Sequence, residues 1–189
     1  MKYYVNIQLQ EDPECTATLL LNAFYQTLHR ILAQQDINIG ISFPDYDKRK
    51  PTLGKRLRLF GSQQHLHHII QHHHLHSLRE HIQRGNILAV PEHTLYCVVK
   101  RVQVKSNAAR LRRRQIRRHG LDAVLARETQ SGKQDEQEKR LNLPFVLLKS
   151  HSTQQTFPLF IQQSLTQIPQ AGGRFNAYAL NQDATLPWF

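Results

Sequence analysis

Arginines between residues 107 and 119 have the type and spacing that most clearly predict chemistry. At 3.6 residues per helical turn, five of them fall within about 140° of arc: Arg110, Arg113, Arg114, Arg117 and Arg118. Guanidinium groups crowded on one side of a helix repel one another, and little apolar surface lies opposite them for docking on a core. An anionic partner removes that repulsion. The pattern therefore favours a nucleic-acid contact over a merely solvated basic face.

The charge of the whole chain is concentrated around this helix. The chain has 25 Lys and Arg against 14 Asp and Glu, a formal net charge of +11. Residues 100–118 hold nine of those basic groups and no acid, which leaves 16 against 14 elsewhere. This asymmetry predicts a localised contact with a polyanion.

The expected strand at residues 96–105 precedes the arginine helix and presents Arg101, Gln103 and Lys105 on one face. Arg can contact guanine through two hydrogen bonds, and Gln can do the same for adenine. Taken alone, this face is more typical of an ordinary solvated strand. A helix-turn-helix would need a short helix here, so DNA binding of that kind is disfavoured. A short RNA hairpin suits an arginine-rich helix better, because the A-form major groove opens near helix ends and loops.

A run of histidines between residues 65 and 81 is a second candidate for chemistry. Its members are His65, His67, His68, His72, His73, His74, His76 and His81. The helical spacing of His68, His72 and His76 could let a pair of them bind a metal. Because neither cysteine nor a carboxylate cluster completes a site, we favour a polar helix face and predict no metal and no cofactor. These histidines would gain charge below about pH 6.5 and add to the attraction for RNA.

Size and composition restrict the class of protein. The chain has 189 residues, which is long enough for one large domain or two small ones. Hydrophobic residues make up 40% of it, enough to bury a core. No stretch approaches the roughly 20 apolar residues that span a bilayer, and the N-terminus lacks a signal-peptide core. Cys15 and Cys97 lie too far apart in sequence to suggest a disulfide scaffold. We therefore expect a soluble, cytoplasmic protein without a membrane partner.

The first half predicts a ferredoxin-like domain over residues 1–94. Apolar residues alternate over 3–9, which indicates a strand, and recur with helical spacing from 16 to about 35. Strands are expected at 37–43, 56–60 and 87–90, with a helix between the last two that is capped by Ser62 and runs to about 78, either continuous or with a break. This order, βαββαβ, is the split pattern of ferredoxin-like domains.

The second half, residues 95–189, predicts an RNA-recognition region with an α+β composition. It contains the strand at 96–105, the arginine-rich helix at about 107–119, and a polar surface segment at 129–138. Short strands are expected at 145–149, 157–161 and 175–180.

Several segments carry a family resemblance. They are RVQVKSNAARLRRRQIRRH at 101–119, ISFPDYD at 41–47, LPFVLLKSHST at 143–153, GGRFNAYAL at 172–180, and the terminal Pro187, Trp188 and Phe189. In this order and over essentially the whole chain, they resemble the CRISPR repeat-processing endoribonucleases of type I-F systems. The arginine segment is specific, whereas the other pieces are individually weak and jointly strong.

The resemblance implies a metal-independent endoribonuclease that cuts CRISPR precursor RNA at the base of each repeat hairpin. In this family a ribose 2′-hydroxyl attacks the adjacent phosphate, leaving a 2′,3′-cyclic phosphate and a 5′-hydroxyl. The resemblance also implies that the protein stays bound to the hairpin product and joins the other subunits of the type I-F surveillance complex.

Residue roles follow from the same resemblance. His29, Ser150 and Tyr178 match the catalytic residues, while Ser152, Thr153 and Phe157 match phosphate and stacking contacts. The predicted RNA-binding set is Arg101, Gln103, Lys105, Arg110, Arg113, Arg114, Arg117, Arg118, His119, Ser152, Thr153 and Phe157.

The chemistry of these residue types fits the implied reaction. A 2′-hydroxyl needs a general base, and histidine ordinarily titrates near neutrality. The hydroxyl of Ser150 could hold the 2′-oxygen in line, and Tyr178 could orient His29 through a hydrogen bond. Two alternatives remain open: a non-catalytic protein that binds an RNA hairpin on the same scaffold, and a basic DNA-binding regulator.

Overall fold

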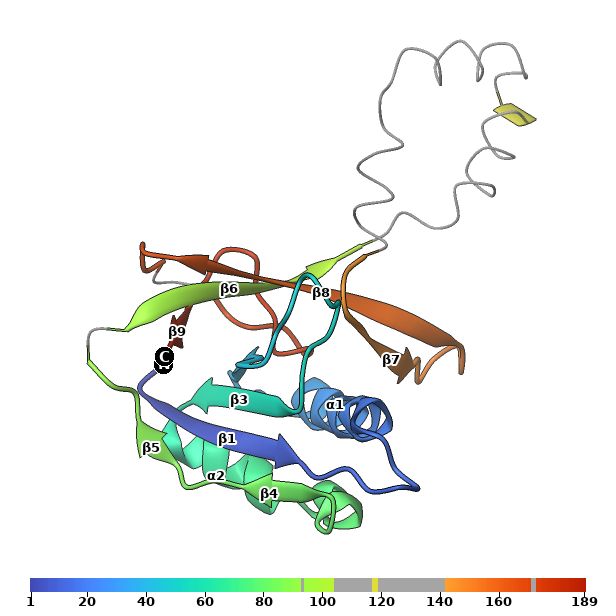
Figure 1. Cartoon of the computed structure of the whole chain (residues 1–189), viewed down its shortest axis with the longest axis horizontal. Coiled ribbons are helices and arrows are strands. Elements are labelled where there is room, and N and C mark those ends of the chain that lie inside the picture. Colours follow the sequence, from blue (N-terminus) through green and yellow to red (C-terminus); the bar gives the residue numbers. More distant parts are fainter. Residues whose placement is uncertain (93, 104–116, 119–141, 171–172) are drawn as a thin grey trace.

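The computed structural model describes residues 1–92, 94–103, 117–118, 142–170 and 173–189, and contains two antiparallel sheets (Figure 1). The first sheet uses β1 (Tyr3–Leu9), β2 (Gly40–Ser42), β3 (Arg56–Gly61), β4 (Ile82–Arg84) and β5 (Leu88–Ala89). Its strand order is β2-β3-β1-β4, with β5 also paired to β1. The second uses β6 (Leu95–Val102), β7 (Phe145–Lys149), β8 (Thr156–Thr166) and β9 (Leu186–Trp188), in the order β7-β8-β6-β9. The fold is therefore mixed α+β.

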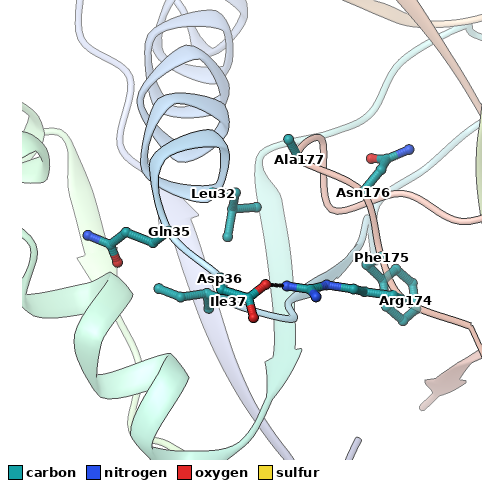
Figure 2. Close-up of a pocket in the computed structure, with 8 residues that line it drawn as sticks. All are labelled: Leu32, Gln35, Asp36, Ile37, Arg174, Phe175, Asn176 and Ala177. Carbon is teal, nitrogen blue, oxygen red and sulfur yellow. Dashed lines mark ion pairs between the residues drawn. The ribbon is translucent and has the colours of Figure 1, made fainter.

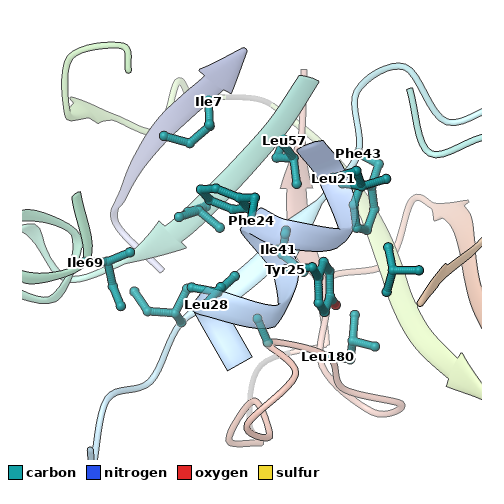
Figure 3. Close-up of a cluster of buried hydrophobic side chains, with 14 of the residues drawn as sticks. Ile7, Leu21, Phe24, Tyr25, Leu28, Ile41, Phe43, Leu57, Ile69 and Leu180 are labelled. Carbon is teal, nitrogen blue, oxygen red and sulfur yellow. The ribbon is translucent and has the colours of Figure 1, made fainter. Parts of the chain in front are cut away.

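Helix α1 (Ala17–Gln34) forms where the sequence shows an apolar stripe at spacings of three and four. Its buried residues are Leu20, Leu21, Phe24, Tyr25, Leu28, Ile31 and Leu32. This stripe is wide because the helix packs against β1 of the first sheet and β7 of the second, and also against the 3₁₀ helix η1 (His73–Leu78). Figure 3 shows α1 side chains beside Ile7, Ile41 and Leu57 of the first sheet, and beside Leu180 from the second half of the chain. The helix thus connects both layers.

The helix predicted after Ser62 is present but broken. Helix α2 (Gln63–Gln71) begins as expected, with the Ser62 Oγ accepting a hydrogen bond from the backbone N–H of His65 at 3.1 Å. It ends at His72, whose extended backbone (ψ 131°) separates it from η1. Strand β4, which follows η1, was not predicted, because three residues are too few to display a period.

The strand predicted at residues 175–180 is wrong. This segment is a turn, because the Asn176 Oδ1 accepts hydrogen bonds from the backbone N–H groups of Tyr178 (2.8 Å) and Leu180 (3.2 Å). Ala179 has a left-handed φ of 59°, which ends any extended run. The last strand of the chain is instead β9, and β8 is twice as long as expected, reaching Thr166.

Side chains join the two halves. Gln163 of β8 is buried, and its amide both donates to the Phe43 carbonyl and accepts from the Phe43 N–H, each at 2.9 Å. Arg58 of β3 donates to the Phe189 backbone oxygen at 2.6 Å, with its guanidinium 4.0 Å from that ring. One cluster of buried side chains includes residues from both halves, so the predicted division at residue 94 stays a prediction.

Two further sequence-based expectations concern the segment between β6 and β7. The predicted arginine helix at about 107–119 lies mostly outside the described residues, although Arg117 and Arg118, which are described, are helical and exposed. The polar segment at 129–138 lies wholly outside the described residues. Among the described residues, no helix is both long enough and apolar enough to cross a bilayer.

Candidate active site

His29 lies in the fourth turn of α1, half-buried, and two contacts orient its ring. Its Nδ1 is 2.8 Å from the carbonyl oxygen of Ala177, and its ring stacks on Tyr178 with centroids 4.2 Å apart and an interplanar angle of 13°. The hydrogen bond expected from Tyr178 is therefore made by the main chain of the preceding residue, while Tyr178 contributes a stacked face. Both contacts come from a turn nearly 150 residues away in sequence.

The Ala177 carbonyl selects the tautomer of His29. A carbonyl oxygen can only accept, so the Nδ1 atom must carry the proton that it donates. In the neutral ring this leaves the Nε2 lone pair free. His29 can therefore accept a proton at Nε2 without changing its hydrogen bond to Ala177, as a general base requires.

The turn at residues 176–180 is itself held from two sides. Asn176 closes it through the two side-chain hydrogen bonds described above, and the Ala179 N–H donates to the Asn176 carbonyl at 2.8 Å. From α1, the fully buried Tyr25 hydroxyl donates to the carbonyl of Tyr178 at 2.7 Å. Burial raises the pKa of Tyr25 well above its ordinary value, so this hydroxyl stays protonated and remains a donor. Tyr25 and His29 lie four residues apart on α1, and both form hydrogen bonds to the segment at 176–180.

Arg101 extends the site towards the second sheet. Its guanidinium carbon lies 5.5 Å from the ring centroid of Tyr178 and 6.0 Å from that of Phe157, near the outer limit for cation–π contact. Arg101 pairs with Ile161 in the β6–β8 register, one residue before β6 ends at Val102. The predicted residues His29, Tyr178, Arg101 and Phe157 thus form one continuous group of contacts.

Ser150 begins a tight turn between β7 and β8. Its Oγ is 3.2 Å from the Oγ of Ser152 and accepts from the N–H of Thr153 at 3.3 Å. Its backbone N–H donates to the carbonyl of Gln155 at 2.9 Å. Ser152 and Thr153 are exposed and Ser150 is half-buried, so three hydroxyl groups gather on one small loop. Such a loop can offer hydroxyl donors to a phosphate or a ribose oxygen.

Helix α1 connects the Ser150 turn to His29. The Gln26 amide accepts from the N–H of Lys149 at 2.7 Å and donates to its carbonyl at 3.2 Å, while Asn22 Oδ1 accepts from the N–H of Leu147 at 2.9 Å. Gln26 lies three residues before His29, so one helix face holds both the end of β7 and the catalytic candidate. The sequence analysis missed this role, although polar residues at 22, 26 and 29 break an otherwise apolar face.

A pocket of about 350 Å³ adjoins this group at the end of α1 (Figure 2). Its lining consists of Leu32, Gln35, Asp36, Ile37, Arg174, Phe175, Asn176 and Ala177. Ala177 belongs to both the pocket and the hydrogen bond of His29. Arg174 forms an ion pair with Asp36 across the pocket, as Figure 2 shows. Both Arg174 and Asn176 were absent from the sequence-based set.

Of the remaining predicted contacts, some are exposed and the others lie outside the described residues. Gln103 is exposed at the end of β6, and Arg117 and Arg118 are exposed. The rest fall outside the described residues: Lys105, Arg110, Arg113, Arg114 and His119.

Comparison with known proteins identifies the family of this chain. Residues 4–189 match the family model described as CRISPR-associated protein (Cas_Csy4). The chain is 41% identical over 190 residues to the CRISPR-associated endonuclease Cas6/Csy4 of Pseudomonas aeruginosa strain UCBPP-PA14, with all of both chains covered. It is 38% identical over 190 residues to the protein of the same name from Escherichia coli strain UTI89, again with complete coverage of both. The chain is a CRISPR-associated protein, and it belongs to the Cas_Csy4 family, as the resemblance indicated.

Proposed function

We propose that this protein is a sequence- and structure-specific endoribonuclease that cleaves CRISPR precursor RNA at the base of each repeat hairpin. One observation carries the proposal: the His29 ring is stacked on Tyr178 and hydrogen-bonded through Nδ1 to Ala177, which leaves Nε2 free to accept a proton. The names of both full-length relatives, which describe CRISPR-associated endonucleases, support the substrate class.

In the proposed reaction, the 2′-oxygen of the ribose bonds to the neighbouring phosphorus while the bond from phosphorus to the 5′-oxygen breaks. Nε2 of His29 takes the 2′ proton, and the departing 5′-oxygen takes up a proton from solvent or from the imidazolium. The products are a 2′,3′-cyclic phosphate and a 5′-hydroxyl. Because the ribose supplies the nucleophile and His29 the base, none of these steps needs a metal ion.

Ser150 and Arg101 have supporting roles in this proposal. The Ser150 hydroxyl, on its hydrogen-bonded turn, would hold the 2′-oxygen in line with the departing oxygen. Arg101 would contact the base of the hairpin stem, with Phe157 beneath it as a stacking surface for the terminal base pair. Ser152 and Thr153, exposed on the same turn, would contact phosphate oxygens.

We further propose that a ferredoxin-like N-terminal fold carries this site; the order β2-β3-β1-β4, with α1 and α2 in the two crossovers, supports it. The arginine-rich segment would lie in the groove of the hairpin and keep the product bound. Neutralisation of about five phosphates would lower the affinity by some three to five powers of ten per tenfold rise in salt. The hairpin complex would then join the type I-F surveillance assembly.

The decisive experiment uses a type I-F repeat hairpin RNA in the presence of EDTA. A matched RNA carries a single 2′-deoxy nucleotide immediately before the expected cut. We expect one cut in the first RNA, with a cyclic phosphate on its 5′ fragment, and none in the second. Cleavage of the deoxy RNA would refute attack by the 2′-hydroxyl, and loss of cleavage in EDTA would refute independence from metal.

The variant His29→Ala separates an enzyme from a non-catalytic binder of RNA hairpins. An enzyme loses cleavage and keeps its affinity for the hairpin. Tight binding by the native chain without any cut would instead support the binder. Competition with duplex DNA of the same sequence tests the third possibility, because a DNA-binding regulator would bind the two nucleic acids comparably.

A further inference from the structure

The three histidines at the break between α2 and η1 converge in space. Atoms of His72, His73 and His74 that can bind a metal all lie within 4.8 Å of one another. Consecutive residues of one continuous α-helix point about 100° apart, whereas here His72 lies between two helices. The extended backbone at His72 interrupts the helix and turns the three imidazoles together. This cluster differs from the i, i+4, i+8 pattern that the sequence suggested.

A fourth imidazole borders the cluster. The ring of His68, one turn earlier on α2, is 5.5 Å from the ring of His72, with an interplanar angle of 72°. The His72 ring is also 4.5 Å from His73 and 4.9 Å from His74. His72 therefore has three neighbouring imidazoles.

The backbone that carries this cluster is held in place. Arg84 of β4 donates to the carbonyl of Ile70 at 2.6 Å and to the carbonyl of Leu75 at 3.4 Å, so it spans the break from one side to the other. Leu75 is buried immediately after the cluster, which anchors η1 to the core. A ligand set on such a supported turn loses less conformational entropy on binding than one on a free loop.

We propose that His72, His73 and His74 form a binding site for a divalent transition metal, with His68 or water as the fourth ligand. The Zn–N distance of about 2.0–2.1 Å in a tetrahedral site places ligand nitrogens roughly 3.3 Å apart, so the imidazoles need to close by about 1.5 Å. Rotation of half-exposed side chains can supply that movement. The site is independent of the proposed cleavage reaction and would stabilise the junction between α2 and η1.

The donors determine which metals fit. Imidazole nitrogen suits zinc, copper and nickel, whereas magnesium, calcium and manganese prefer oxygen ligands. Partial burial is the main cause that lowers the pKa of both His72 and His74, with neighbouring histidines and Arg30 contributing. We therefore expect Zn²⁺ to bind and Mg²⁺ not to bind.

One contact opposes binding. The Nδ1 of His72 accepts a hydrogen bond from the His74 N–H at 3.3 Å, which places the ring proton on Nε2. A metal can bind Nδ1 of His72 only by displacing this N–H. It can bind Nε2 only after the ring proton has left that atom. The hydrogen bond is long, so its loss is a small cost. Replacing His72 would remove this hydrogen bond as well as a ligand, so the variants that test the site keep His72.

The test titrates Zn²⁺ into the full chain, purified without a polyhistidine tag, by calorimetry. His73→Ala/His74→Ala removes two ligands, and His67→Ala/His76→Ala removes two exposed histidines of the same region as a matched control. We expect one Zn²⁺ per native chain, an affinity at least about 100-fold lower in the cluster variant, and an affinity within about twofold of native in the control. Equal losses in both variants, or no stoichiometric binding by the native chain, would overturn the site.

Spectroscopy keeps the proposal testable if the cluster variant folds poorly. Co²⁺ added to the native chain should give the intense visible absorption of a tetrahedral nitrogen site, and Zn²⁺ should abolish it by displacement. Only the weak spectrum of octahedral, water-bound Co²⁺ would contradict the proposal. Because neither measurement uses RNA, failure here leaves the proposed endoribonuclease untouched, and a failure of cleavage leaves the metal site untouched.

Discussion

His29 and the histidines of residues 65–81 contain the same side chain in two different settings. His29 stands alone on its helix face, and a carbonyl at 2.8 Å and a stacked tyrosine hold its ring. The rings of His72, His73 and His74 mainly contact one another. A general base needs one nitrogen with a set tautomer and direction, whereas a metal site needs several nitrogens that converge. The three converging imidazoles of His72, His73 and His74 therefore favour metal binding, whereas the fixed ring of His29 favours proton transfer.

The largest expected effect is that of His29→Ala. Removing the base should slow cleavage by about 10²- to 10⁴-fold under single-turnover conditions, while the affinity for a 2′-deoxy hairpin stays within about twofold. The control is His67→Ala/His76→Ala, which should leave the rate unchanged. A control that slows cleavage as much as His29→Ala would contradict the assignment of the general base to His29 alone.

Asn176→Ala should have the next largest effect, since it opens the turn that presents both Ala177 and Tyr178 to His29. Misplacement of a catalytic group by about 1 Å can cost up to 10²-fold, so we expect cleavage to slow by about 10- to 100-fold without a matching change in hairpin affinity. Asn176→Asp keeps an acceptor oxygen and should recover most of the rate. An Asp variant no faster than the Ala variant would contradict this positioning role.

Tyr178 tests whether stacking or the phenol hydroxyl matters for His29. Tyr178→Phe preserves the stacked ring and should cleave at nearly the native rate, whereas Tyr178→Leu should be slower by up to about tenfold. The estimate comes from the 0.5–1.5 kcal/mol that an aromatic pair contributes beyond its buried area. A Phe variant as slow as the Leu variant would show that the hydroxyl takes part directly.

The smallest effect is expected from Gln26→Ala, which removes the two hydrogen bonds between α1 and Lys149. Each is worth about 0.5–1.5 kcal/mol, so the free energy of unfolding should fall by about 1–3 kcal/mol in a urea titration. Cleavage should slow only a few-fold, since the turn that bears Ser150 retains its internal bonds. A loss of rate as large as that of Asn176→Ala would mean that α1, rather than the turn at 176–180, controls the geometry.

Local periodicity explains which elements could be predicted. The alternation over residues 3–9 and the helical stripe of α1 are visible in the sequence, and both elements are present at nearly the expected bounds. Gln163 lies where such reasoning fails: the strand was expected to end at residue 161, but β8 continues to Thr166, and the buried Gln163 is hydrogen-bonded to the backbone of Phe43. Strand β9, which contains Pro187, was not predicted; it lies at the edge of its sheet, where a missing N–H is tolerated.

The residues of the candidate site also differ in whether the sequence could predict them. The resemblance predicted His29, Ser150 and Tyr178, but no pattern indicated Asn176 or the Ala177 carbonyl, because a hydrogen-bonded turn in place of a strand shows no period. For the histidine run, the sequence contains the nitrogens but not the break at His72 that gathers three of them.

By itself, the sequence determined the family, the main helices and strands, and a concentration of positive charge that calls for an anionic partner. Each of these depends on residue type and short-range spacing, which the geometry of a single helix or strand converts into a face. Only the tertiary structure decided which way His29 points, which atom carries its proton, and which histidines meet. Those properties depend on contacts such as that between His29 and Ala177, 148 residues apart, which form only when α1 packs against both sheets.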